Sequence, residues 1–183
     1  MSGGNASRNC WNKKPAGQGL TRQKTMAFFR GPGHHFVVKN LLCSVPIFAG
    51  LDEKALEIFL DHAGKAVVAD GGVIAREGET NHCMYIIEAG SVRIVKNFDT
   101  PDGVTLAMLG PGEFFGEMCI LEPMPRAATG QATGPATVVS VSSSAFYHLY
   151  QKMPAQHSIL ILNIARDLSR RLRHLDEVFA ARH

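Results

Sequence analysis

One short segment, residues 114–129, holds the residue types that bind phosphorylated sugars. Gly116 allows the backbone to approach a ligand closely, and residues 117–121 are expected to form a short helix whose first N–H groups favour an anion. Glu117 is a pure hydrogen-bond acceptor suited to hydroxyl groups, and Arg126 presents a planar fork of donors suited to phosphate. The segment therefore predicts a pocket for a sugar phosphate.

The same side chains also allow a purely structural interpretation. Glu117 and Arg126 could form an ion pair beneath a turn of a sheet, which is a common device in folded proteins. Ala127 and Ala128 favour a pocket, because small residues leave room and expose backbone N–H groups. On side-chain chemistry alone, the pocket and the ion pair remain equal alternatives.

Short apolar runs separated by glycine turns must position this segment. Asp102-Gly103 gives the strongest hairpin signal, between runs at 91–97 and 104–109. About eight short strands in succession predict a mainly β fold with flanking α-helices, an eight-stranded double-stranded β-helix or jelly-roll barrel. The expected strands are 65–69, 73–76, 84–88, 91–97, 104–109, the end of a strand at 114–115, 126–133 and 136–142.

Helices are expected on both sides of the strands. Asp52 is placed to cap an N-terminal helix whose apolar face includes Leu56 and Phe59. Residues 142–153 read as one C-terminal helix, and Pro154 begins a second that runs to about Ala180. The expected domains are a tail at 1–35, a barrel with its N-terminal and first C-terminal helix at 36–153, and a lid or dimerisation helix at 154–183.

Charge is distributed unevenly along the chain, which has a formal net charge of +3. Lysines and arginines precede the first acid, Asp52, and the segment before residue 36 lacks periodicity. We expect residues 1–35 to be a disordered basic tail rather than a nucleic-acid or targeting arm. No apolar run is long enough to span a membrane and no secretory signal is recognised, so a cytoplasmic location is expected.

Other chemistries find little support in the sequence. The cysteines form no CxxC pair, and the turn containing His82 lacks the HxH pair that a metal-binding cupin needs. The sequence motifs of hydrolases, zinc proteases and P-loop proteins do not occur. We therefore expect a ligand-binding module rather than an enzyme, with no metal site and no cofactor.

The string FGEMCILEPMPRAAT closely resembles the phosphate-binding cassette of the cyclic-nucleotide-binding domain family. That family includes the bacterial catabolite activator protein and the regulatory subunits of the cyclic-AMP-dependent kinase. The similarity extends over about Phe36 to Arg173. It includes the string VPIFAGLD, the turn at Glu77–Glu79, the strand at Tyr85–Gly90 and the glycines around Pro111.

The resemblance implies roles for individual residues. Glu117 would accept the ribose 2′-hydroxyl, Arg126 would pair with the cyclic phosphate, and Gly116 and Ala127 would supply backbone contacts. Alanine rather than threonine at position 127 implies a preference for cyclic AMP. Cyclic GMP remains the alternative ligand. The implied ligand-binding set is Phe115, Gly116, Glu117, Met118, Cys119, Pro125, Arg126, Ala127 and Ala128.

The resemblance also implies a function: a cyclic-nucleotide sensor that regulates an unknown partner protein. One alternative is a scaffold of the same fold that has lost its ligand, and another is a transcription regulator without its own DNA-reading domain. The apolar stripe of the last helix favours a homodimer through residues 154–180, although Arg171 interrupts the heptad spacing. Direct DNA binding is not expected, because no helix-turn-helix follows that helix.

Overall fold

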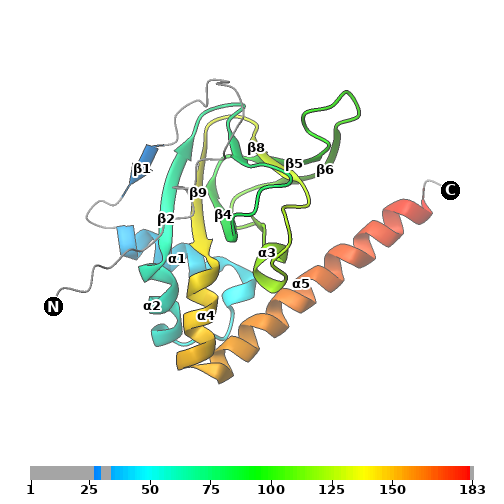
Figure 1. Ribbon diagram of the computed structural model, residues 1–183. Coiled ribbons are helices and arrows are strands. Elements are labelled where there is room, and N and C mark those ends of the chain that lie inside the picture. Colours follow the sequence, from blue (N-terminus) through cyan, green and yellow to red (C-terminus); the bar gives the residue numbers. More distant parts are fainter. Residues whose placement is uncertain (1–26, 30–33, 182–183) are drawn as a thin grey trace.

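The computed structural model describes residues 27–29 and 34–181. Two antiparallel sheets face one another, and helices cover the outer side of one sheet (Figure 1). The first sheet has the order β1-β2-β9-β4-β7, and the second has the order β3-β8-β5-β6. The strands are β1 (Ala27–Phe29), β2 (Ala63–Val68), β3 (Val73–Ala75), β4 (Cys83–Ala89), β5 (Val92–Lys96), β6 (Val104–Leu109), β7 (Phe114–Phe115), β8 (Thr129–Ala132) and β9 (Ala136–Ser142).

Most helices lie at the two ends of the strand succession. Before β2 come α1 (His34–Ser44), the 3-10 helix η1 (Pro46–Phe48) and α2 (Glu53–Asp61). After β9 come α4 (Ser143–Lys152) and α5 (Pro154–Ala180), and α3 (Met118–Leu121) is a single turn between β7 and β8. Asp52 caps α2 as expected, since its side chain accepts a hydrogen bond from the N–H of Ala55 at 2.8 Å.

Strand β4 is buried on both faces and divides the core in two. Met84 and Ile86 face the helices, whereas Cys83, Tyr85 and Ile87 face the space between the two sheets. This alternation follows from the two-residue period of a strand. It places the ring of Tyr85 on the side of the sheet where the arginine of the cassette lies.

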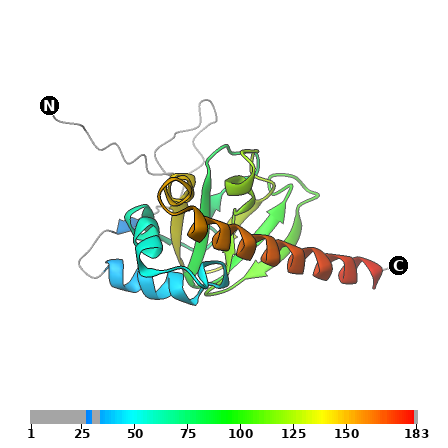
Figure 2. The same cartoon turned by 90° about the horizontal axis from the view of Figure 1, so that it is seen from below.

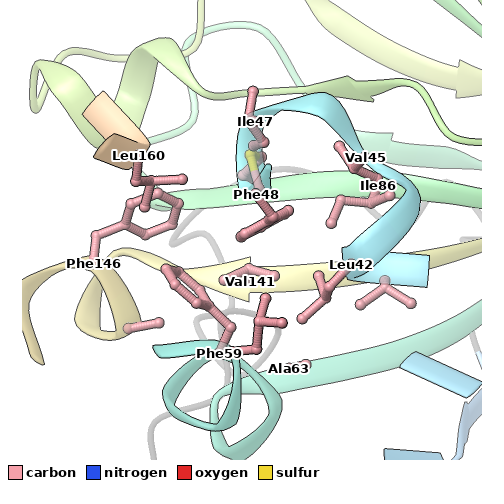
Figure 3. Packing of buried hydrophobic residues seen from close by; sticks show 14 of the residues in the cluster. Leu42, Val45, Ile47, Phe48, Phe59, Ala63, Ile86, Val141, Phe146 and Leu160 are labelled. Atoms are coloured by element: carbon pink, nitrogen blue, oxygen red, sulfur yellow. The ribbon is translucent and has the colours of Figure 1, made fainter. Parts of the chain in front are cut away.

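The helical part of the core holds the helices against the first sheet. Phe59 of α2 makes edge contacts with Phe48 and Phe146, at ring-centroid distances of 5.1 and 5.2 Å. Val141 of β9 and Leu160 of α5 pack in the same cluster (Figure 3). The beginning of α5 is therefore fixed to the domain by side-chain packing.

The prediction of a mainly β jelly roll with an N-terminal helix and two C-terminal helices is confirmed. The two sheets are not closed into a barrel, because β1 and β7 end one sheet and β3 and β6 end the other. The expected strand at 126–133 begins only at Thr129, since the main chain of Arg126 bonds to Gly78 and Glu79 and that of Ala127 to Lys96.

The predicted basic tail, residues 1–35, lies largely outside the described residues. Its described part contains β1, which pairs antiparallel with β2, and the start of α1. In the described part of the chain, none of the helices combines the length and the apolar character that crossing a bilayer requires.

Helix α5 is packed at its beginning and exposed towards its end. Leu160 and Ile164 are fully buried and Leu168 is partly packed on the core, but Leu172 and Phe179 are 60% and 67% exposed. Figure 2 shows the C-terminal part of the helix extending past the sheets. Its placement relative to the sheets therefore depends on contacts of its first half.

Candidate functional site

Arg126 lies in the loop between α3 and β8 and is held there by main-chain hydrogen bonds. Its N–H donates to the carbonyl of Glu79 at 2.9 Å, and its carbonyl accepts from the N–H of Gly78 at 2.9 Å. These two bonds fix the loop against the turn that precedes β4. The arginine side chain consequently enters the molecule at the start of β4.

The guanidinium of Arg126 is bound by uncharged oxygen atoms. Nε donates to Oδ1 of Asn81 at 2.8 Å, and Nη2 donates to the same oxygen at 2.5 Å and to the carbonyl of Cys83 at 2.6 Å. Arg126 is only 4% exposed, yet no carboxylate of the described residues lies within ion-pair distance of it. A buried cation without an anionic partner is costly, so this arrangement favours the arrival of an anion.

Aromatic rings form one wall beside this guanidinium. Its Cζ lies 5.0 Å from the ring centroid of Tyr85, which stacks on Phe115 at 5.2 Å. Burial raises the pKa of Tyr85 to about 12, so the phenol stays neutral at physiological pH. The neighbouring rings give Arg126 a low-dielectric surrounding without an opposing charge.

Gly116 makes close approach possible between the cassette and the arginine. Its φ is +83°, a conformation that L residues with a side chain rarely adopt. A Cβ at this position would lie 2.4 Å from Nη1 of Arg126 and 2.9 Å from the carbonyl oxygen of Cys83. Nη1 of Arg126 therefore lies directly beside a bare stretch of backbone.

Glu117 is also buried, but its partner is on α5. Its side chain is 5% exposed, and Oε1 lies 3.5 Å from Nη1 of Arg171. Burial raises the pKa of this carboxyl, whereas the charge of Arg171 acts in the opposite direction. The alternative in which Glu117 and Arg126 form a structural ion pair is wrong, because each charge has its own separate partners.

The other residues of the predicted set occupy different surroundings. Phe115 and Cys119 are buried, Ala128 is half-buried, and Pro125 and Ala127 are exposed. Lys96 binds the carbonyl oxygen of Ala127 through Nζ at 2.9 Å, which fixes the loop after Arg126. Met118 is 56% exposed, so its side chain points away from the buried charges.

Two polar residues at the site escaped the sequence-based prediction. Asn81 lies 45 positions before the arginine that it binds, and Arg171 lies 54 positions after Glu117. The break that Arg171 makes in the apolar stripe of α5 was the available signal for it. Asn81 gave no signal, because its role depends on the pairing of two distant loops.

The site therefore presents two opposite charges with separate tasks. A buried guanidinium with neutral partners can bind an anion, and a buried carboxylate can accept a hydrogen bond from a hydroxyl group. Gly116 directly precedes Glu117 in the chain and lies beside Nη1 of Arg126, so a ligand can approach the main chain there. In the described part of the chain, no group of three or more potential metal ligands is found.

Comparison with known proteins agrees with this geometry. Residues 65–153 match the family model described as Cyclic nucleotide-binding domain. The chain is 29% identical over 131 residues to the cyclic AMP receptor protein of Thermus thermophilus, covering 72% of this chain and 59% of that protein. It is 28% identical over 127 residues to the cAMP-dependent protein kinase regulatory subunit of Blastocladiella emersonii, covering 62% of this chain and 32% of that subunit.

Solved structures also share the fold of this chain. A solved cyclic nucleotide-binding domain from Methylobacillus flagellatus superposes with a TM-score of 0.72 at 19% sequence identity, covering 86% of this chain and 89% of that one. The chain spans less than two thirds of the two full-length relatives named above. Over residues 65–153, the chain contains a domain of the cyclic nucleotide-binding domain family.

Proposed function

We propose that this chain binds a cyclic nucleotide, preferentially cyclic AMP, and acts as a regulatory sensor through a partner protein. The observation that carries the proposal is the buried Arg126 guanidinium, which is 4% exposed and hydrogen-bonded only to neutral oxygen atoms. A cyclic phosphate would supply the missing negative charge, with Nη1 and the backbone at Gly116 as its nearest donors.

Glu117 has the complementary role in this proposal. An ionised carboxylate has only acceptor sites, so it suits a ribose hydroxyl and disfavours a phosphate oxygen. Arg126 and Glu117 would thus fix the ligand in one orientation, with the phosphate at one group and the sugar at the other. Their separation into independent clusters keeps each charge available for its own part of the ligand.

The preference for cyclic AMP rests on position 127. Ala127 has no hydroxyl that could donate to or accept from a guanine, and its carbonyl is already bound by Lys96. The names of the Thermus and Blastocladiella relatives both refer to cyclic AMP. These observations support cyclic AMP as the ligand and leave cyclic GMP as the competitor to be tested.

The chain also offers a surface for output. The distal part of α5 exposes three large apolar side chains, Leu172, Leu175 and Phe179. We propose that a second copy of the chain pairs with this helix through residues 154–180. Such pairing or a separate effector protein would transmit the bound state. Catalysis is not part of this proposal, and the two named relatives are a receptor and a regulatory subunit.

Calorimetric titration of protein freed from co-purified nucleotide tests the proposal directly. We expect cyclic AMP to give saturable heat with one site per chain, and cyclic GMP to bind more weakly. An absence of binding for both nucleotides would contradict the proposal and favour a scaffold that has lost its ligand. Unchanged folding in the stripped protein, measured by circular dichroism, is the control.

Substitution of Arg126 tests the residue that carries the proposal. Arg126→Ala is expected to weaken cyclic AMP binding by about 2–5 kcal/mol, because the desolvated phosphate loses its charged partner. Arg126→Lys keeps the charge but loses the bidentate geometry, and we expect intermediate affinity. Equal affinity for wild type and Arg126→Ala would mean that the ligand is bound elsewhere.

A further inference from the structure

We propose that Lys96, the last residue of β5, is a positioning residue of the binding site, which holds the main chain after Arg126 so that its N–H groups stay available to the ligand phosphate. The inference rests on the proposed function and deepens it, because it assigns a role in the same site to a residue outside the cassette. Lys96 lies 31 positions before Ala127, on the β5–β6 hairpin. It acts on the ligand through the main chain of the cassette loop.

The ammonium group of Lys96 connects two segments that are far apart in the chain. Nζ donates to the carbonyl oxygen of Ala127 at 2.9 Å and also to Oε1 of Glu77, in the turn before β4. An ammonium is a compact charge on a flexible stem, so it needs a second partner to define its place. Glu77 supplies that partner and thereby fixes the group that holds Ala127.

Glu77 is itself held at three points. Its Oε2 accepts from the N–H of Asn97 at 2.8 Å, so both carboxylate oxygens bind the β5–β6 hairpin. Its own N–H donates at 3.0 Å to Oγ1 of Thr129, which is buried at the start of β8. The hydrogen bonds from Lys96 and from Asn97 lower the pKa of Glu77, so this carboxylate stays ionised at neutral pH. The turn, the hairpin and the cassette loop therefore meet at one fixed charge.

These bonds orient two successive peptide groups after the arginine. The carbonyl of Arg126 accepts from the N–H of Gly78, and the carbonyl of Ala127 accepts from Lys96. A trans peptide group points its N–H away from its carbonyl, so the N–H groups of Ala127 and Ala128 point away from the turn and the hairpin. Neither N–H donates a hydrogen bond to another residue that the structure describes. Two adjacent N–H groups of this kind suit an anion.

Loss of Lys96 would release the second of these peptide groups. The carbonyl of Ala127 could then turn towards water, and the N–H of Ala128 would turn with it, since the two atoms belong to one plane. The charge of Arg126 would remain, but the main-chain donors beside it would no longer be fixed. Lys96 therefore contributes to affinity by holding donors in place, whereas Arg126 contributes the charge itself.

Calorimetric titration of two matched variants tests this role. Lys96→Met is expected to weaken cyclic AMP binding on the order of tenfold, because a charge-assisted hydrogen bond that orients the loop is lost. Lys96→Arg keeps donors for both partners and should recover most of the affinity. Arg76→Met is the control, since Arg76 joins the same turn to the same hairpin by binding Asp99 at 2.5 Å. It should bind as wild type does.

The control separates positioning from general stability. Both cations are partly exposed, at 45% for Lys96 and 39% for Arg76, so the two methionine variants should unfold at similar temperatures. Equal losses of affinity in Lys96→Met and Arg76→Met would overturn the proposal. They would mean that any bond between the turn and the hairpin serves the site equally well.

A double-mutant cycle tests whether Glu77 acts through Lys96. Glu77→Gln should weaken binding by about threefold, less than Lys96→Met does. The double variant should bind no more weakly than Lys96→Met alone, because the carboxylate has then lost the group that it fixes. Additive losses would show that Glu77 and Lys96 serve the ligand separately, and the proposed connection between them would be wrong.

Amide NMR spectra supply a readout at the main chain itself. In wild type, saturating cyclic AMP should shift the amide signals of Gly116 and Ala128. In Lys96→Met, the shift of Ala128 should shrink while that of Gly116 is retained. Identical shifts of Ala128 in the two proteins would contradict the positioning role.

The outcomes separate this inference from the proposed function. If wild type binds neither cyclic AMP nor cyclic GMP, the proposed function fails, and the role of Lys96 fails with it. If wild type binds and Lys96→Met matches Arg76→Met in affinity and in the Ala128 signal, the proposed function stands and the role of Lys96 alone is wrong.

Discussion

Two arginines approach the cassette, and their partners differ in kind. Arg126 is buried by the sheets and bonded to an amide and a main-chain carbonyl, whereas Arg171 is half-buried on α5 and bonded to Asp167 and Glu117. Arg171 is thus largely neutralised by the protein's own carboxylates. Arg126 retains its full positive charge, which is what an anionic ligand requires.

The difference follows from the elements that supply the partners. A helix brings residues three and four positions apart onto one face, so Asp167 and Arg171 pair within α5 without help from the rest of the fold. Arg126 instead takes its partners from the start of β4, where Asn81 and Cys83 offer only neutral oxygens. The sheet thereby holds the Arg126 guanidinium in place without neutralising its positive charge.

Gly116→Ala should give the largest loss of cyclic AMP affinity. It strains the backbone beside Arg126 and also introduces a contact with the guanidinium. The φ of +83° is strained for alanine, at a cost of about 1–3 kcal/mol in the free energy of unfolding. The new Cβ would also displace the guanidinium, and cyclic AMP binding should be abolished in calorimetry.

Gly112→Ala is the matched control for this prediction. Its φ is +82°, but nothing lies within 4 Å of the added Cβ. It should show the backbone cost in thermal unfolding and keep its ligand. If both variants bound cyclic AMP equally well, close packing at Gly116 would have no part in binding.

Asn81→Asp, combined with Glu79→Gln, would give Arg126 the kind of partner that Arg171 has. The exchange keeps the net charge and moves one carboxylate to within hydrogen-bond distance of the guanidinium. The new ion pair should compete with the phosphate and weaken cyclic AMP binding on the order of tenfold or more.

Thermal unfolding of the ligand-free double variant is the companion measurement. Its melting temperature should equal or exceed that of wild type, since a buried cation has gained a partner. Undiminished affinity in the double variant would show that neutral partners around Arg126 do not matter for binding.

Asp167→Asn should give the smallest change. It removes one carboxylate from Arg171, whose side chain is 38% exposed, and helical pairs of this kind contribute roughly 0.3–0.5 kcal/mol. We expect about a twofold change in cyclic AMP affinity and a marginal shift in melting temperature. A loss of affinity as large as that of the Asn81 variant would place Asp167 in contact with the ligand. The proposed difference between the two arginines would then be wrong.

Local patterns explain most of what the sequence predicted. The order of strands, the cap at Asp52 and the helix beginning at Pro154 depend on residues close together in the chain, and the structure contains them. The cassette was located for the same reason, since Gly116 and Arg126 lie within one short segment. Short-range chemistry was sufficient for these features.

Long-range contacts explain which features could not be predicted from the sequence. Asn81 binds Arg126 because the turn before β4 and the loop before β8 pair through Gly78 and Glu79, and nothing in either segment specifies the other. The side-chain direction of Met118 likewise depends on how α3 lies on the sheet. Closure of the barrel was expected from strand number, but the edge strands leave the two sheets separate.

The uneven attachment of α5 has a mechanical consequence. A helix rises about 1.5 Å per residue, so the stretch from Ile164 to Ala180 forms a rigid arm roughly 24 Å long. A tilt of about 5° at its buried base would move Arg171 by roughly 1 Å and the far end by roughly 2 Å. A small rearrangement beside the cassette can therefore reach a neighbouring molecule at about twice its original size.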